Sequence, residues 1–170
     1  KTRVAFRASH PSSGAVKLTA PPSLRKISMT YSPITDTRID SALAQLGVQT
    51  GRSDDGEVVA AFEDAQIVFI TDGGLTTAQA HWMRGTYDED QADLMREVLN
   101  RINMIIPLGK AVTATSEWGA TMAFRHHFFS SSGVSDAQLV AMFDLYLKVT
   151  FFIINELETT FPNTVSATEA

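Results

Sequence analysis

The feature that most constrains the fold is a long apolar segment near the C-terminal end, residues 135–159, SDAQLVAMFDLYLKVTFFIINELET. Ser135 and Gln138 have the spacing of a capping box, which predicts that a helix begins here. Apolar side chains then occupy almost every side of that helix, which is typical of a helix at the centre of a bundle or at a subunit contact. We therefore expect Phe143 and Phe152 to be buried, and truncation of either to alanine to cost on the order of 3–5 kcal/mol.

The polar residues within this segment and the absence of cysteine from the chain limit what kind of protein this is. A membrane span needs about 20 mostly apolar residues, and the run 139–157 is interrupted by Asp144, Lys148, Asn155 and Glu156. The sequence has no cysteine, which excludes disulfides, thiolate metal sites and a cysteine nucleophile. A chain of 170 residues is expected to fold as one domain with a substantial core.

Helix start signals recur along the chain, as a Ser, Thr or Asp followed three residues later by Glu or Gln. The pairs are Asp54 with Glu57, Thr76 with Gln79, Asp88 with Gln91, and Ser135 with Gln138. With apolar residues at helical spacing, they predict helices near 37–47, 55–63, 76–85, 89–105, 116–130 and 135–159. The run 65–71, AQIVFIT, is a strand or the end of a buried helix. The predicted fold class is mainly α, a helical bundle core with an extended N-terminal arm and little β.

The first 35 residues differ from the rest of the chain in charge and composition. They carry a charge of +6 without any acidic residue, which leaves −11 on the remainder. Pro21 and Pro22 exclude a helix around them, so this segment forms edge strands or an arm that lies along another surface. The asymmetry predicts an acidic partner, namely nucleic acid, a membrane surface or the body of a neighbouring copy, unless the charges are only solvated.

These observations divide the chain into three parts. We expect an extended basic arm at 1–35, a helical core at 36–160 and a C-terminal tail at 161–170.

Motifs for catalysis or metal binding are not recognisable. Two of the four histidines, His126 and His127, are adjacent and would point about 100° apart on a helix, so they do not naturally share a metal. There is no HExxH, GxSxG or GxGxxG motif. The turn TDGGL at 71–75 precedes a predicted helix start and could bind an anion, but a plain turn is the simpler interpretation. We expect no metal, no cofactor and no enzymatic activity.

Arg125 and Asp144 stand out because each lies inside an apolar segment predicted to be helical. A charge in such a place is expensive unless it is paired. The two residues form a structural salt bridge, face the surface separately, or act together. In the last case Arg125 presents its guanidinium group to a phosphate while Asp144 orients it.

Three stretches resemble coat proteins of flexible filamentous plant viruses. They are VSDAQLVAMFDLYLKVT with its FD followed by aromatics, ATMAFRHHFF with its arginine, and LTTAQAHWMRG, whose Trp82 is followed later by Trp118. The resemblance implies a helical core, an arm that docks on the next subunit, and single-stranded RNA in a groove. By the same resemblance Arg125 and Asp144 line the RNA site, and Ser116 and Thr121 touch phosphate.

The leading hypothesis from the sequence is therefore a non-enzymatic coat or nucleocapsid subunit. It polymerises through its arm and is found in a virion or in host cytoplasm. It binds RNA along a basic track formed by Arg84, Arg96, Arg101, Lys110 and Arg125. One alternative is a helical small-molecule-binding or sensor domain, with Arg125, His126 and His127 around a cavity. A small enzyme with a dispersed site is the remaining alternative.

Overall fold

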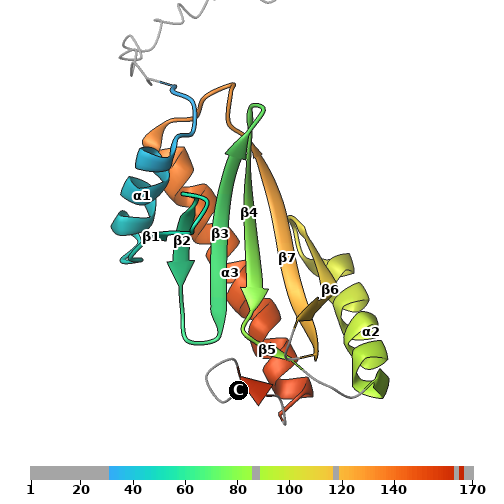
Figure 1. Cartoon of the computed structure of the whole chain (residues 1–170). Helices are drawn as coiled ribbons and strands as arrows, with labels where there is room; N and C mark the ends of the chain where they lie inside the picture. Colours follow the sequence, from blue (N-terminus) through green and yellow to red (C-terminus); the bar gives the residue numbers. More distant parts are fainter. Residues whose placement is uncertain (1–30, 86–88, 117–118, 163–164, 167–170) are drawn as a thin grey trace, which may run out of the picture.

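The computed structural model describes residues 31–85, 89–116, 119–162 and 165–166 (Figure 1). These residues contain the helices α1 (Asp36–Gln45), α2 (Glu89–Ile105) and α3 (Asp136–Thr160). The strands are β1 (Gly51–Arg52), β2 (Val58–Ala61), β3 (Ala65–Asp72), β4 (Leu75–Trp82), β5 (Arg84–Gly85), β6 (Lys110–Ser116), β7 (Gly119–Phe129) and β8 (Val165–Ser166).

A six-stranded antiparallel sheet dominates the fold, so the predicted mainly α bundle is wrong. The strand order is β1-β2-β3-β4-β7-β6, and β5 pairs separately with β8. The long connection that carries α2 joins the β4–β5 region to β6, which places β7 beside β4 and leaves β6 at the edge (Figure 1).

Three of the predicted helices are strands. Residues 55–63 contain β2, residues 76–85 contain β4 and β5, and residues 116–130 contain β7. The helices predicted at 37–47, 89–105 and 135–159 are confirmed as α1, α2 and α3, and the undecided run 65–71 is β3.

The misassignment of β4 has a clear physical reason. Its buried side is formed by Thr76, Ala78, Ala80 and Trp82, so that three of the four core-facing residues are small or polar. Because these residues are not strongly apolar, the alternation of apolar and polar residues that marks a strand is absent from the sequence. In addition, Thr76 and Gln79 have the spacing of a capping box, which indicates a helix. In the structure the Thr76 hydroxyl instead lies 3.2 Å from that of Thr71 on the neighbouring strand.

The capping box at Ser135 is confirmed. The Ser135 hydroxyl accepts a hydrogen bond from the Gln138 backbone N–H at 3.2 Å, and the Gln138 side chain accepts one from the Ser135 N–H at 2.9 Å. The Asp54 pattern lies in the turn between β1 and β2, and Asp88 lies outside the described residues.

The core lies between the sheet and α3, which crosses behind the strands in Figure 1. Phe143 of α3 is fully buried, and its ring centroid lies 5.1 Å from that of Phe69 and 5.6 Å from that of Phe128. Tyr146 stacks on Phe124 at 5.1 Å, and its hydroxyl donates to the Phe124 carbonyl at 3.1 Å. The expectation that Phe152 is also buried is wrong, since 41% of it is exposed.

α3 is the one helix among the described residues that is long and apolar enough, by length and composition, to cross a membrane. Eight of its residues are buried, and its outer side carries an ion pair between Asp144 and Lys148 at 2.6 Å. Packing against the sheet therefore explains its apolar character.

The first described residues belong to the folded body rather than to an arm. Ser32 forms an antiparallel bridge with Val134, and Ile34 is buried in the core. The Arg38 guanidinium donates to the carbonyls of Pro33 and Val134 at 2.8 and 2.7 Å. Residues 31–35 therefore do not extend away from the body, whereas residues 1–30 lie outside the described part and the three-part division of the chain stays a prediction.

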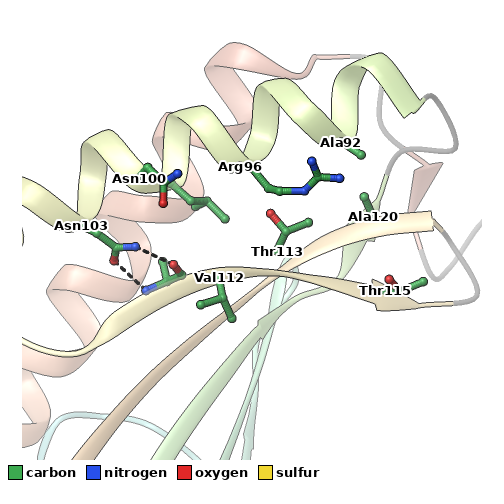
Figure 2. Close-up of a pocket in the computed structure, with 10 residues that line it drawn as sticks. Ala92, Arg96, Asn100, Asn103, Val112, Thr113, Thr115 and Ala120 are labelled. Atoms are coloured by element: carbon green, nitrogen blue, oxygen red, sulfur yellow. Dashed lines mark hydrogen bonds between the residues drawn. The ribbon is translucent and has the colours of Figure 1, made fainter.

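α2 is fastened to the edge strand β6 through one side chain. The Asn103 amide donates to the Ala111 carbonyl at 2.7 Å, and its oxygen accepts from the Ala111 N–H at 2.9 Å (Figure 2). The Asn103 side chain thus satisfies both backbone groups of Ala111, as a neighbouring strand would, and it covers part of the exposed edge.

Candidate functional site

The described residues leave one face of the sheet uncovered. In Figure 1, α3 lies behind the strands, α1 lies at the β1–β2 edge next to α3, and α2 lies along β6. Because side chains alternate along a strand, the residues of β4 and β7 that do not face α3 point to the other side. These include Thr77, Gln79 and His81 on β4 and Arg125 and His127 on β7.

Two positive charges face each other on this side of the sheet. Lys110 of β6 is the direct antiparallel partner of Arg125 of β7. Like charges directly opposite each other are destabilising, and neither residue forms an ion pair with any acidic residue in the described part of the chain. The Lys110 ammonium donates a hydrogen bond to the Asn103 carbonyl near the end of α2 at 3.3 Å, but no carboxylate of the described part neutralises either charge.

Gly109 allows this close approach of the two strands. Its φ is +68°, and a Cβ placed there would lie 2.5 Å from the Phe124 ring and 2.7 Å from the Arg125 carbonyl oxygen. A side chain would clash with both, so this position requires glycine. The glycine allows β6 to begin at Lys110, directly opposite Arg125.

A hydrogen-bond chain orients Arg125. Its Nε–H donates to Oε1 of Gln79 at 2.7 Å, and this donation fixes the orientation of the Gln79 amide. The amide nitrogen of Gln79 then donates to Nε2 of His81, which requires that this ring nitrogen be unprotonated. The two terminal nitrogens of Arg125 have no hydrogen-bond partner among the described residues and can bind a ligand.

Two histidines of this region are held toward their neutral form. Burial lowers the pKa of His81, and the positive charge of Arg125 lowers it further. Burial also lowers the pKa of His126, with a smaller effect from His127. The His126 ring packs edge-on against Phe128, with ring centroids 4.6 Å apart. An anion bound beside these rings would reverse the effect and favour their protonation.

The lowered pKa values predict how stability depends on pH. In the unfolded chain these histidines take up a proton near their ordinary value of about 6.5, whereas in the folded chain they do so only at lower pH. Stability is then full above that value and decreases as the pH falls below it. We expect the urea midpoint to drop between about pH 7.5 and 5.5, and to drop less for His81→Gln. Equal pH dependence in the two proteins would contradict the role given to His81.

A pocket of about 310 Å³ opens between these charges at the end of the β6–β7 ladder. Its lining residues are Gly109, Lys110, Val112, Arg125, His126 and His127. It brings together Arg125, His126 and His127, the three residues that the sequence placed around a cavity under the sensor-domain alternative. The sequence indicates Lys110 only as one member of a basic track, and the strand register is needed to show that it lies directly opposite Arg125. Gly109 has no functional signal in the sequence. We call these six residues the basic pocket.

Arg125 and Asp144 are not paired. Arg125 lies on the uncovered face of the sheet, whereas Asp144 lies on α3 behind it and pairs with Lys148. The interpretation of both as separate surface-facing groups is the one that agrees with the structure.

The remaining predicted site residues are scattered. Thr121 is buried, and its hydroxyl donates to the Trp82 carbonyl at 2.7 Å, which is a structural contact. Arg84 forms an ion pair with Asp64 at 2.7 Å. Ser116 ends β6, and its side chain lies outside the described part. Neither Thr121 nor Arg84 lines the basic pocket.

The sequence profile of the YbjN family, described as "Putative bacterial sensory transduction regulator", matches residues 35–158. The match covers α1 to α3, including all of the six-stranded sheet. The chain belongs to the YbjN family. The crystal structure of YbjN from E. coli, described as "a putative transcription regulator", is similar to this YbjN-family chain with a TM-score of 0.64. The two are 10% identical, and the similarity covers 77% of this chain and 96% of the E. coli chain, which shows a shared fold. No curated protein sequence matches the chain.

Membership of a bacterial YbjN family overturns the resemblance to viral coat proteins. The predictions that depended on it are wrong as well: a capsid subunit, polymerisation through the arm, single-stranded RNA as partner, and a place in a virion or host cytoplasm. The short motifs behind the resemblance lie on different kinds of element, since ATMAFRHHFF is part of β7 rather than a helix. The alternative of a sensor or binding domain agrees better with the family, although the domain is not mainly helical.

Proposed function

We propose that this YbjN-family chain is a regulatory sensor domain that binds a phosphate-bearing small molecule in the basic pocket. The observation that carries the proposal is the directly opposed pair of Lys110 and Arg125, which no acidic residue of the described part neutralises. A bound dianion would convert this repulsion into attraction. Binding would therefore stabilise the β6–β7 ladder.

The donors of the pocket suit a phosphate group. Arg125 offers a planar fork whose geometry matches two phosphate oxygens. Lys110 adds a point charge, and its exposed side chain can leave the Asn103 carbonyl to reach a ligand. His127 lies on the same face, and its Nδ1 is 2.8 Å from the hydroxyl of Thr77. A volume of about 310 Å³ is at the small end of the range for ligand pockets, which favours a small molecule over a large cofactor.

We also propose that the domain acts by binding rather than by catalysis. Thr77 and His127 have the separation of a nucleophile and its base. However, no carboxylate of the described part hydrogen-bonds to His127 to orient it, and a third group of this kind is part of such sites. The hydroxyl and the ring therefore serve better as ligand contacts.

The direct test is calorimetric titration with inorganic phosphate at fixed ionic strength. A hydrogen bond to a charged group contributes about 1.5–3 kcal/mol, so Arg125→Gln should weaken phosphate binding by about 10-fold to 100-fold. Arg101→Gln removes the same charge from an exposed position of α2 that does not line the basic pocket, and should bind as the wild type does. Equal weakening in both variants would point to a nonspecific charge effect and would contradict the proposal.

A further inference from the structure

A second pocket lies on the other side of strand β6, between that strand and α2 (Figure 2). Its volume is about 450 Å³. Because residues alternate along β6, Thr113 and Thr115 face this pocket, whereas Lys110 belongs to the basic pocket. Val112 borders both pockets, but they share no charged residue.

The side chain of Thr113 is the unusual feature of this pocket. Its hydroxyl is buried and has no hydrogen-bond partner among the described residues. Figure 2 shows the hydroxyl directed toward α2, beneath the side chain of Arg96. A buried polar group without a partner costs free energy, and such groups are rare in folded proteins. The hydroxyl has almost no accessible surface, so a ligand in the pocket would supply the missing hydrogen bond once a neighbouring side chain moves aside.

The α2 side of the pocket supplies a positive charge and an amide, from Arg96 and Asn100. Arg96 forms an ion pair with Asp93 one turn earlier, and the two side chains are 60% and 71% exposed. Exposed pairs of this kind contribute little, so a ligand carboxylate can replace Asp93 at small cost. Leu99 and Ala120 provide an apolar wall beside these polar groups.

We infer that this pocket binds a small organic carboxylate with a short apolar body. Arg96 and the Thr113 hydroxyl bind the carboxylate, and Leu99 and Ala120 contact the apolar body. The volume lies within the usual range for small-molecule sites. The inference does not depend on the basic pocket, so either site can fail its test without affecting the other.

The test uses the full chain, with hexanoate as the probe and 1-hexanol as the probe that lacks the carboxylate. Binding is followed by amide chemical shifts in ¹H–¹⁵N spectra. Thr113→Val keeps the shape of the side chain and removes the hydroxyl, whereas Thr113→Ser keeps the hydroxyl. Melting temperatures of all three proteins without probe show whether each variant folds.

Hexanoate should produce saturable shifts in residues 92–103 and 111–115, and 1-hexanol should bind more weakly. Thr113→Val should weaken hexanoate binding by at least about tenfold, while Thr113→Ser should retain it. Because it removes a buried polar group without a partner, Thr113→Val should also raise the melting temperature of the free protein by about 2–4 °C. Hexanoate binding that is absent, that occurs outside these residues, or that is equal in the wild type and Thr113→Val would overturn the inference.

Discussion

Replacing Phe143 with alanine is expected to lower the free energy of unfolding by about 3–5 kcal/mol. Phe143 is fully buried and contacts the rings of Phe69 and Phe128, so it joins α3 to two strands of the sheet. Its removal leaves a cavity that neither strand can fill without disturbing the ladder. A domain usually has a free energy of unfolding of about 5–15 kcal/mol, so a loss of this size is a large fraction of the total.

Phe152→Ala is the matched control, because it makes the same chemical change on the same helix. Phe152 is 41% exposed, and we expect a cost of about 1 kcal/mol or less. Urea denaturation followed by circular dichroism would give both values. Equal losses in the two variants would mean that α3 does not present Phe143 to the sheet as described.

Replacing Asn103 with alanine is expected to cost about 2–4 kcal/mol, because it removes two hydrogen bonds at once. The Ala111 N–H and C=O lose the partner that α2 gives them, and Ala111 is buried. Few partners remain for these groups, and the attachment of α2 to β6 is weakened. We expect amide hydrogen exchange to rise in α2 and β6 more than in α3.

Asn100→Ala makes the same substitution about one turn earlier on α2, at an exposed position. Its stability should change by less than about 0.5 kcal/mol. An Asn103→Ala variant as stable as Asn100→Ala would show that the side chain does not fasten the helix to the edge strand.

The helices of this fold are visible in the sequence because each has a strong local signal. α3 combines a capping box at Ser135 with a long apolar run, and α2 has a broad apolar side that includes Met95, Leu99 and Ile102, all buried in the structure. Such signals depend on neighbours within one or two turns. They do not require knowledge of the rest of the fold.

Strands β4 and β7 cannot be recognised in the sequence because their signal is not local. β4 presents small and polar residues to the core. In β7 two phenylalanines are adjacent, of which Phe128 is buried and Phe129 is 75% exposed. Both patterns depart from the alternation of apolar and polar residues that identifies a half-buried strand. They are stabilised by antiparallel partners far away in sequence, and these partners cannot be inferred from the strand itself.

The candidate site could be predicted in part. The cluster of Arg125, His126 and His127 is contiguous in the sequence, and for this reason it could be selected as a ligand site. Thr113 has no distinguishing neighbours, and Lys110 is only one of several cations in the predicted basic track. Their importance comes from the register of β6 against β7 and from the position of α2, which only the tertiary structure provides.

The most direct test of the account is to map phosphate binding residue by residue. Inorganic phosphate is titrated into the labelled full chain at fixed ionic strength, and ¹H–¹⁵N spectra are recorded. The account predicts saturable shifts concentrated at residues 109–112 and 125–127, which disappear in Arg125→Gln. Shifts that are absent, or that are spread over residues of α1 and α3, would contradict the claim that the opposed charges of Lys110 and Arg125 form a ligand site.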